Sequence, residues 1–301
     1  MPLLVTGSIG IDTVITPRRR VEGVLGGSAV YFAFAAAHYV PVRLVAVVGE
    51  DFPGEFSGEL EARNIDLAGL EVRKGSRTFR WTGRYSENLN ERDTIEVELN
   101  VLAEDGPRVP AAFADSDTVF LANTHPTQQR TLIAGLNAPK AIVMDTMDLW
   151  IENERDSLLQ TLGMVHGVIL NDAEAVQLTG KLNLVEAGED ILRIGPRFVV
   201  IKKGAHGALL VTGGGVTAIP AYPCRDVCDP TGAGDSFAGG FLGYLAERGG
   251  GGIDDLRNAL VHGTVVASFA IEDFSIGRLK DLAREEIDRR AAEFANMLRF
   301  L

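Results

Sequence analysis

A short glycine-rich segment carries the clearest chemical signal in this 301-residue chain. Residues 229–237 read DPTGAGDSF and continue into an apolar stretch that ends near Leu245. A turn with so few side chains, placed at the start of a helix, leaves backbone N–H groups free to bind an anion. Asp235 adds a carboxylate at the same place. A phosphate cradle with a base beside it predicts phosphoryl transfer to a hydroxyl group.

The simplest alternative for this segment is a tight strand-to-helix turn whose acid complements the helix dipole. That alternative accounts for one glycine and one acid. It does not account for three consecutive small residues, at 232–234, followed directly by Asp235. We therefore favour a functional site over a purely structural turn.

Two weaker motifs follow apolar runs elsewhere in the chain. Asn171 and Glu174 form an N-x-x-E pattern after the run at 168–170. By itself this pattern is more often a solvated helix start. Residues 202–207, KKGAHG, are by themselves only a strand end that contains glycines.

Two common nucleotide-binding fingerprints are missing. Residues 7–12, GSIGID, lack the third glycine of the dinucleotide motif G-x-G-x-x-G. The P-loop pattern G-x-x-x-x-G-K-[ST] does not occur in the chain. Neither a Rossmann dehydrogenase nor a Walker-type ATPase is therefore supported.

The elements that must position these residues alternate between short apolar runs and plausible helices. This rhythm is typical of a parallel sheet with helices on its faces. Ser28 is a good N-cap for the first of those helices. We expect strands at 3–6, 43–48, 118–122, 141–145, 167–170 and 198–202, a hairpin at 208–219, and helices at 28–37, 53–63, 235–247, 256–272 and 279–301.

Several polar or small residues directly follow the predicted strands. In open α/β sheets, ligands bind outside the carboxyl ends of the strands. We therefore expect one edge of the sheet, the edge that carries the glycine turn, to be lined by Gly7, Asn123, Asp145, Asn171 and Gly204.

Residues 77–101 break the strand–helix rhythm. Polar residues alternate there with Phe79, Trp81 and Tyr85, and a second alternating run follows at 94–99. The pattern predicts a β-hairpin with one apolar face, inserted as a small lid. The aromatic stripe is more often packing or a dimer interface than a ligand-stacking surface.

Composition limits the partners of the chain. There are 41 acidic and 29 basic residues, and the net charge of -12 argues against nucleic acid or an anionic membrane as the main partner. The hydrophobic fraction of 46% is enough for a large core. Cys224 and Cys228 cannot form a disulfide framework, and we expect a reducing, cytoplasmic location. No signal peptide or membrane span is evident from the sequence.

Taken together, these motifs resemble the ribokinase, or PfkB, family of small-molecule kinases, and the resemblance covers essentially the whole chain. It implies an α/β fold, a ribokinase-like three-layer α/β/α sandwich with a central, mostly parallel sheet. It also implies a single domain, residues 1–301, with a small β-sheet lid formed by about 12–25 and 76–102. Homodimerisation through the lids is expected from the same resemblance.

The resemblance also implies roles for individual residues. The catalytic base corresponds to Asp235, and the anion hole to Gly232, Ala233 and Gly234. The contacts with the nucleotide correspond to Lys202, Gly204, Gly207, Thr231 and His262. The acceptor side corresponds to Asp12, Gly26, Gly27, Tyr31, Asn123 and Asp145. Water-mediated magnesium contacts correspond to Asn171 and Glu174, and a candidate potassium site includes Asp229.

Four of these matches depart from the family pattern or have a plain alternative. Lys202 stands where many relatives have Thr, although a lysine can pair with a phosphate. Tyr31 stands where many sugar kinases have an Asn that touches the acceptor, and an Arg that often follows the position of Asp145 is missing. His262 has a nearly equal alternative, a histidine packed within its helix.

The implied function is an ATP-dependent kinase that uses Mg²⁺, and in some relatives K⁺, to transfer the γ-phosphoryl group. The acceptor is a primary hydroxyl group of a sugar or a ribonucleoside. Aromatic residues in the lid would suit a flat ring, which favours a nucleoside. The alternative from another class is a catalytically silent regulator that binds a nucleotide or metabolite with a kinase fold.

Overall fold

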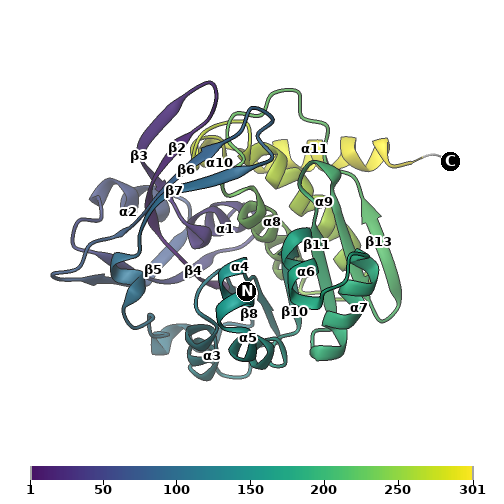
Figure 1. The fold of residues 1–301 in the computed structure, drawn as a ribbon, viewed down its shortest axis with the longest axis horizontal. Helices are drawn as coiled ribbons and strands as arrows, with labels where there is room; N and C mark the ends of the chain where they lie inside the picture. The colour runs from purple at the N-terminus through teal and green to yellow at the C-terminus, as the bar shows by residue number, and fades with distance from the viewer. Residues whose placement is uncertain (1, 300–301) are drawn as a thin grey trace.

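A nine-stranded sheet forms the centre of the protein in the computed structural model, which describes residues 2–299. The strand order is β13-β12-β11-β10-β9-β8-β1-β4-β5 (Figure 1). At one edge, β12 pairs antiparallel with both β11 and β13, and all other neighbouring strands pair in parallel. The strands are β1 (Leu3–Thr6), β4 (Val42–Gly49), β5 (Ile65–Arg73), β8 (Thr118–Leu121), β9 (Ala141–Met144), β10 (Gly167–Asn171), β11 (Phe198–Lys202), β12 (Ala208–Thr212) and β13 (Gly215–Ile219).

Helices cover both faces of this sheet, because alternate side chains of its buried strands point to opposite sides. In β1, Leu3 and Val5 join one hydrophobic core and Leu4 joins the other. One core contains residues of α1 (Ser28–Ala36), α2 (Gly54–Glu61), α8 (Ala233–Arg248), α9 (Ile253–Ala270), α10 (Gly277–Asp281) and α11 (Arg284–Met297). The other contains residues of α3 (Pro126–Ala134), α4 (Asp148–Asn153), α5 (Arg155–Leu162), α6 (Asp172–Thr179) and α7 (Leu184–Ile194). The expected three-layer sandwich is confirmed.

Three short 3₁₀ turns complete the secondary structure of the described part. They are η1 (Asn100–Ala103), η2 (Ala111–Phe113) and η3 (Gly204–His206). The last of them follows β11 directly and lies at the edge of the sheet where the predicted site residues gather.

Glycines on α8 allow this helix to pack closely between α1 and α9. A Cβ atom on Gly239 would lie 2.4 Å from the carbonyl oxygen of Phe32 on α1. A Cβ atom on Gly240 would lie 2.9 Å from the carbonyl oxygen of His262 on α9. All nine residues of α1 are buried, so α8 rests on a rigid support. This packing places the first turn of α8 at the carboxyl edge of the sheet.

A second, four-stranded sheet lies at one end of the molecule, beside α10 (Figure 1). We call it the small sheet; its order is β3-β2-β6-β7. It consists of β2 (Gly10–Ile15), β3 (Arg20–Gly26), β6 (Phe79–Tyr85) and β7 (Arg92–Glu98). The predicted hairpin is confirmed as the antiparallel pair of β6 and β7. The edge strand β7 is almost entirely exposed.

Several predicted elements differ from the structure. Strand β5 was not predicted, and β2 and β3 were expected only as part of a β-sheet lid at about 12–25, without bounds of their own, because their apolar residues are few and interrupted by charges. The helix expected at 279–301 is two helices, separated at Leu282 and Ala283, and residues 300–301 lie outside the described part. Ser28 is the first residue of α1 rather than its N-cap, and its hydroxyl group lies 3.1 Å from that of Ser8. Among residues 2–299, no helix is long and apolar enough to cross a membrane.

Candidate active site

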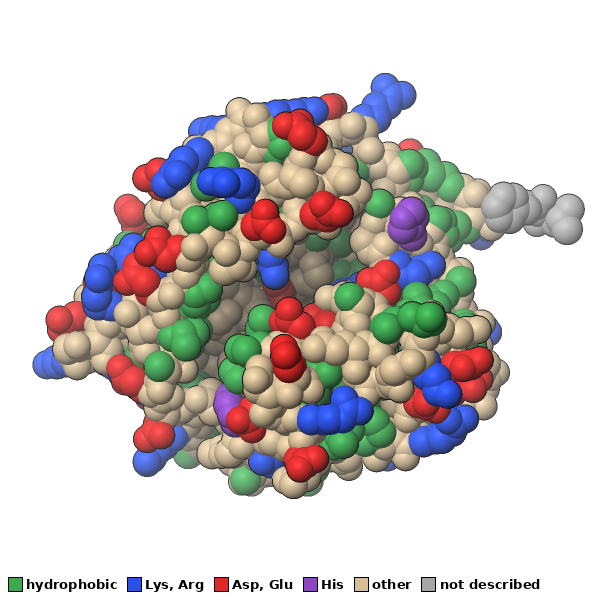
Figure 2. Space-filling model, viewed as in Figure 1, with side chains coloured by type: hydrophobic (Ala, Val, Ile, Leu, Met, Phe, Trp, Pro, Cys, Tyr) green, Lys and Arg blue, Asp and Glu red, His purple; other side chains and the backbone are tan. Residues whose placement is uncertain are grey.

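The carboxyl edge of the large sheet brings the predicted residues together. Asn171 and Lys202 are register partners at the ends of β10 and β11. Asp145 directly follows β9, and Asn123 lies two residues after β8. Figure 2 shows the molecule hollowed between the small sheet and the region of α4 and β8, with acidic side chains near the opening.

The glycine turn has a conformation that only glycine adopts without strain. Gly232 is the N-cap of α8 and has φ 72° and ψ 2°, in the left-handed region. A Cβ atom there would lie 2.2 Å from Cγ of Tyr31, whose ring packs beneath the turn. Glycine at position 232 is therefore required by both backbone geometry and close approach.

Two backbone donors of this turn remain available to a ligand. The N–H of Ala233 donates to the carbonyl oxygen of Pro230 at 3.2 Å. Within residues 2–299, no acceptor contacts the N–H of Gly232 or Gly234. These two donors lie at the start of a sixteen-residue helix. The positive end of the helix dipole at this place also favours a bound anion. The turn can hold an anion through Gly232 and Gly234, whereas Ala233 has a partner already.

Asp235 lies in the first turn of α8 and is buried. The pKa of its carboxyl group is raised to about 7, mainly by burial and also by the nearby carboxylate of Asp145. Lys202 and Arg92 act in the opposite direction. A base is most effective when its pKa lies near the working pH, so this carboxylate is suited to accept a proton.

Lys202 lies beside the same turn. Its Nζ atom is 3.5 Å from Oδ2 of Asp145 and 2.9 Å from the position that a Cβ atom on Gly234 would take. Burial alone would lower the pKa of this lysine, but Asp145, Glu174 and Asp235 together raise it. The ammonium group is thus a protonated cation among three carboxyl groups.

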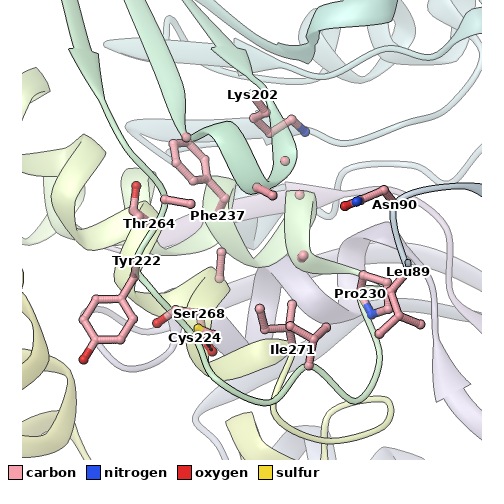
Figure 3. A pocket seen from close by; sticks show the side chains of 18 of the residues that line it. Leu89, Asn90, Lys202, Tyr222, Cys224, Pro230, Phe237, Thr264, Ser268 and Ile271 are labelled. Carbon is pink, nitrogen blue, oxygen red and sulfur yellow. Dashed lines mark hydrogen bonds between the residues drawn. The ribbon is translucent and has the colours of Figure 1, made fainter. Parts of the chain in front are cut away.

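A cavity of about 830 Å³ begins at this turn (Figure 3). Lys202 and Gly234 line one part of it, together with Asn171, Gly204 and Gly207. Its walls farther from the turn are mainly apolar or weakly polar and include Tyr222, Cys224, Thr264, Ala267, Ser268 and Ile271. The volume lies in the range of sites for small molecules and cofactors.

Glycines shape the wall of this cavity after β11. Gly204 has φ 53° and Gly207 has φ 84°. A Cβ atom on Gly207 would lie 2.0 Å from the carbonyl oxygen of Ile219. The backbone can therefore turn sharply here and leave room for a ligand beside Lys202.

His262 does not line this cavity in the part of the chain that the structure describes. Its ring stacks on Tyr244, with centroids 4.2 Å apart, and its Nδ1 atom lies 3.0 Å from the hydroxyl oxygen of Tyr39. Its pKa is lowered to about 4, mainly by burial and also by the positive charge of Arg284. These contacts fit the alternative of a packed helix histidine; Thr264 and Ser268 of the same helix face the cavity instead.

Asn171 and Glu174 cap the start of α6. Oδ1 of Asn171 accepts the N–H of Glu174 at 2.7 Å, and Oε2 of Glu174 accepts the N–H of Asn171 at 2.7 Å. This reciprocal capping box explains the N-x-x-E spacing by itself. Among residues 2–299, no cluster of three or more His, Cys, Asp or Glu side chains could hold a metal directly.

The predicted acceptor residues of the N-terminal segment are in contact. A Cβ atom on Gly26 would lie 1.9 Å from Oδ2 of Asp12, so only glycine fits beside this carboxylate. Gly27 has φ 104°, and its Cα lies against the carbonyl group of Ser8. Oδ1 of Asp12 is buried without a hydrogen-bond partner. Burial raises the pKa of Asp12 to about 7, with a further contribution from Asp229.

Tyr31 lies beneath the glycine turn and is 1% exposed, so its ring forms the floor of the turn. Its hydroxyl group is buried without a partner. Asp229 accepts the N–H of Thr231 at 2.9 Å and the N–H of Ser275 at 3.4 Å. The hydroxyl groups of Thr231 and Tyr85 are 2.9 Å apart, which joins the small sheet to the turn.

Residues 4–280 match the sequence model of the family described as pfkB family carbohydrate kinase. The chain belongs to this family. It is 31% identical over 255 residues to the cytidine kinase of Thermococcus kodakarensis, with 82% of this chain and 90% of that protein covered. It is 27% identical to the nucleoside kinase of Methanothermobacter thermautotrophicus, with 90% of this chain and 89% of that protein covered.

The fold of this pfkB-family kinase is also that of solved structures. The crystal structure of Methanocaldococcus jannaschii nucleoside kinase, an archaeal member of the ribokinase family, superposes with a TM-score of 0.78. The sequence identity is 20%, and the match covers 97% of this chain and 98% of that one. The family and the ribokinase-like fold expected from the sequence are confirmed, and the kinase is a small-molecule phosphotransferase.

Sequence reasoning missed Arg92 of this kinase. Arg92 begins β7, lies over the ring of Trp81 at 5.3 Å from its centroid, and lines the cavity next to the glycine turn. Its charge also lowers the pKa of Asp235. No spacing could have identified it, because the chain contains many exposed arginines and only the pairing of β6 with β7 brings this one to the site.

Trp150 was also given no role. Its Nε1–H donates to Oδ1 of Asn123 at 2.8 Å, and its ring lies edge-on to that of His125 with centroids 5.1 Å apart. The amide nitrogen of Asn123 lies 3.0 Å from the sulfur of Met147. These side chains form a half-exposed aromatic and amide surface at the ends of β8 and β9.

Proposed function

We propose that this protein is an ATP- and Mg²⁺-dependent kinase that transfers the γ-phosphoryl group to a primary hydroxyl of a ribonucleoside. One observation carries the proposal. Asp235, a buried carboxylate with a pKa near 7, lies in the same turn as two unpaired N–H donors, at the start of a cavity of about 830 Å³. That combination suits an anion and a hydroxyl group that must lose a proton.

The chemistry follows from the loose transition state of phosphoryl transfer. The acceptor hydroxyl oxygen forms a bond to the γ-phosphorus as the bond from that phosphorus to the β,γ-bridging oxygen breaks. ADP leaves with the electron pair of the broken bond, and Asp235 takes the hydroxyl proton. The N–H groups of Gly232 and Gly234 stabilise the charge on the phosphoryl oxygens.

We place the nucleotide in the cavity, with its phosphates near Gly204, Gly207 and Lys202. The weakly polar walls around Thr264 and Ser268 suit a purine ring. Mg²⁺ would neutralise the phosphates, and its water shell would contact Oε1 of Glu174. We keep Asp229 and Thr231 as a candidate potassium site because their backbone carbonyl groups adjoin the turn.

We place the acceptor between the two sheets. Asp12 has a free, buried carboxylate oxygen that can accept hydrogen bonds from two vicinal ribose hydroxyls. The surface formed by Asn123 and Trp150 offers an amide and an aromatic ring to a nucleobase. The similarity to a cytidine kinase and to a nucleoside kinase over most of the chain supports a nucleoside rather than a free sugar.

We propose that the small sheet is the lid of the site and that two copies of the chain pair through it. Its edge strand exposes two large apolar side chains, Ile95 at 48% and Val97 at 46%, and Leu99, which follows the strand, is 52% exposed. A sheet face of this kind needs a cover. We also propose a cytoplasmic location, since Cys224 and Cys228 are both free thiols, as expected in a reducing compartment.

An acceptor screen tests the proposed function. Cytidine, adenosine, inosine, ribose, fructose and fructose phosphates are offered separately with ATP and Mg²⁺, and ADP release is measured. We expect release with at least one ribonucleoside and at most a trace with free sugars.

Release with a sugar alone would overturn the nucleoside assignment while leaving phosphoryl transfer in place. Binding of a nucleoside without ADP release from any acceptor would favour the silent regulator instead.

A further inference from the structure

Lys202 lies at the junction of the turn and the carboxyl edge of the sheet. It is the last residue of β11, and its side chain is 17% exposed. Figure 3 shows it at one side of the cavity, with its terminal nitrogen directed away from Phe237 and toward the part of the cavity lined by Asn90. The ammonium group is therefore within the cavity rather than in bulk solvent.

The partner of Lys202 in the protein is held rigidly. Oδ1 of Asp145 accepts the N–H of Thr146 at 2.8 Å, and its carbonyl oxygen accepts Nε2–H of Gln129 at 3.2 Å. Oδ2 lies 3.5 Å from Nζ of Lys202, which is longer than a close charge-assisted hydrogen bond. Asp145 thus positions the lysine with a loose contact that a stronger anion can replace.

Such an anion would bind on the other side of the lysine. Nζ is 2.9 Å from the position of a Cβ atom on Gly234, so the ammonium group adjoins the unpaired N–H of that residue. A phosphoryl oxygen that accepts this N–H would also be within reach of the lysine. A methyl group at Gly234 would occupy the space next to the ammonium group and displace it.

We propose that Lys202 leaves Asp145 for the γ-phosphoryl group when the nucleoside triphosphate binds, and remains on that group during transfer. The proposal rests on the phosphotransferase function above. Lys202 is then a catalytic residue, and Asp145 is a positioning residue for it rather than an acceptor ligand. Lys202 keeps its proton throughout; the hydroxyl proton goes to Asp235, and ADP leaves with the electron pair of the broken P–O bond.

Nucleotide binding without an acceptor tests this exchange. With Mg²⁺ present, calorimetry compares a non-hydrolysable ATP analogue with ADP. We expect Lys202→Met to lower the affinity for the analogue by about 10- to 100-fold, the usual loss for a hydrogen bond to a charged group, and the affinity for ADP by less than threefold. Equal losses for both nucleotides, or no loss for either, would overturn the assignment to the γ-phosphoryl group.

Asp145→Asn gives a prediction of the opposite sign. Without the competing carboxylate, the lysine is free for the phosphoryl group, so we expect the analogue to bind severalfold more tightly while ADP binding stays unchanged. A lysine that only supports the structure would give weaker binding of both nucleotides. Unchanged or weaker binding of the analogue would overturn the exchange.

Two further variants complete the test. Lys181→Met removes an exposed lysine after α6 and should leave both affinities unchanged. If Lys202→Met does not fold, Lys202→Arg, which keeps the charge, should retain most of the preference for the analogue over ADP, and loss of that preference would count against the proposal. With an acceptor present, Lys202→Met should lower kcat by about 10²- to 10³-fold and change the KM of the acceptor by less than threefold.

The result of these binding measurements can be interpreted independently of the acceptor screen. The binding measurements need no acceptor, so an incorrect nucleoside assignment would leave them interpretable. Wild-type protein that binds neither nucleotide would overturn the proposed kinase function itself.

Discussion

The glycine turn and the small sheet are built in opposite ways. The turn rests on Tyr31, and α8 behind it is packed between two helices through glycines, so its groups are buried and closely placed. The small sheet ends in β7, which is exposed along nearly its whole length. The turn therefore holds charged groups away from water. The side chains of β7 in the small sheet are instead in contact with solvent, where substitutions disturb little packing.

The two regions meet at a few side chains from β6 and β7. Tyr85 places its hydroxyl group 2.9 Å from that of Thr231, and Arg92 lines the same cavity as Gly234. We propose a division of roles, in which the turn carries out the transfer and the small sheet contributes closure and acceptor preference. Changes in the turn should thus have much larger effects on the reaction than changes in the small sheet.

The largest effect is expected for Asp235→Asn. The amide cannot accept the hydroxyl proton, so kcat should fall by about 10²- to 10⁴-fold, while ADP binding stays within twofold of wild type. Steady-state kinetics and calorimetry measure the two quantities. Asp156→Asn, at an exposed position on α5, is the matched control. More than a tenth of wild-type kcat in the Asp235 variant would remove this residue as the base.

The pH dependence should report the same carboxylate. Its pKa is raised to about 7, so it is ionised above pH 7 and becomes protonated, and inactive as a base, below it. We expect kcat/KM to fall about tenfold per pH unit below pH 7, or more steeply if Asp12, whose pKa is also about 7, must be ionised too. A profile that is flat down to pH 5 would contradict this.

Removing the link between the two regions should have a moderate effect. Tyr85→Phe deletes the hydroxyl group that pairs with Thr231, and a neutral hydrogen bond contributes about 0.5–1.5 kcal/mol. We expect kcat/KM to fall by about 2- to 10-fold with the same pH profile. Tyr244→Phe, on the far part of α8, is the control. A loss as large as that of Asp235→Asn would show that closure of the small sheet is as important as the base.

The smallest effect on the fold is expected on the outer face of the small sheet. Val97→Asp should separate the proposed dimer and change the free energy of unfolding of each chain by less than about 0.5 kcal/mol apart from the lost interface. Val216→Asp is a matched control, since Val216 is 44% exposed on β13 and Val97 is 46% exposed. Light scattering measures the mass. Unchanged mass in the Val97 variant would exclude this face as the interface.

Much of the fold follows from patterns within short stretches of sequence. The buried strands of the large sheet are continuous apolar runs, because both of their faces are covered, and such runs are recognisable without a structure. The pattern of residues did not delimit β2, β3 or β5, because they lie at edges or in the small sheet, where exposed positions carry charges; only the family resemblance indicated strands at about 12–25. Their strand character comes from pairing with distant partners.

In the site, too, some features follow from local sequence and others only from the tertiary structure. The grouping of Gly232, Gly234 and Asp235 is local, so spacing alone was enough to predict it. His262 and Lys202 were each given a nucleotide contact by resemblance; Lys202 lines the cavity beside Asp145, whereas His262 packs on Tyr244. Which neighbour a side chain meets depends on how α9 and β9 are placed, and no spacing within either motif contains that information.

The sequence by itself determined the class of fold and predicted an anion site at the glycine turn, since three consecutive small residues before a helix leave backbone N–H groups free. Only the tertiary structure decided which donors of that turn are free, that Tyr31 supports it, and that Lys202, Asp145 and Arg92 converge beside it. The physical reason is distance along the chain. Local patterns record backbone geometry, whereas the charges that surround a buried group come from strands and loops that meet only in the folded protein.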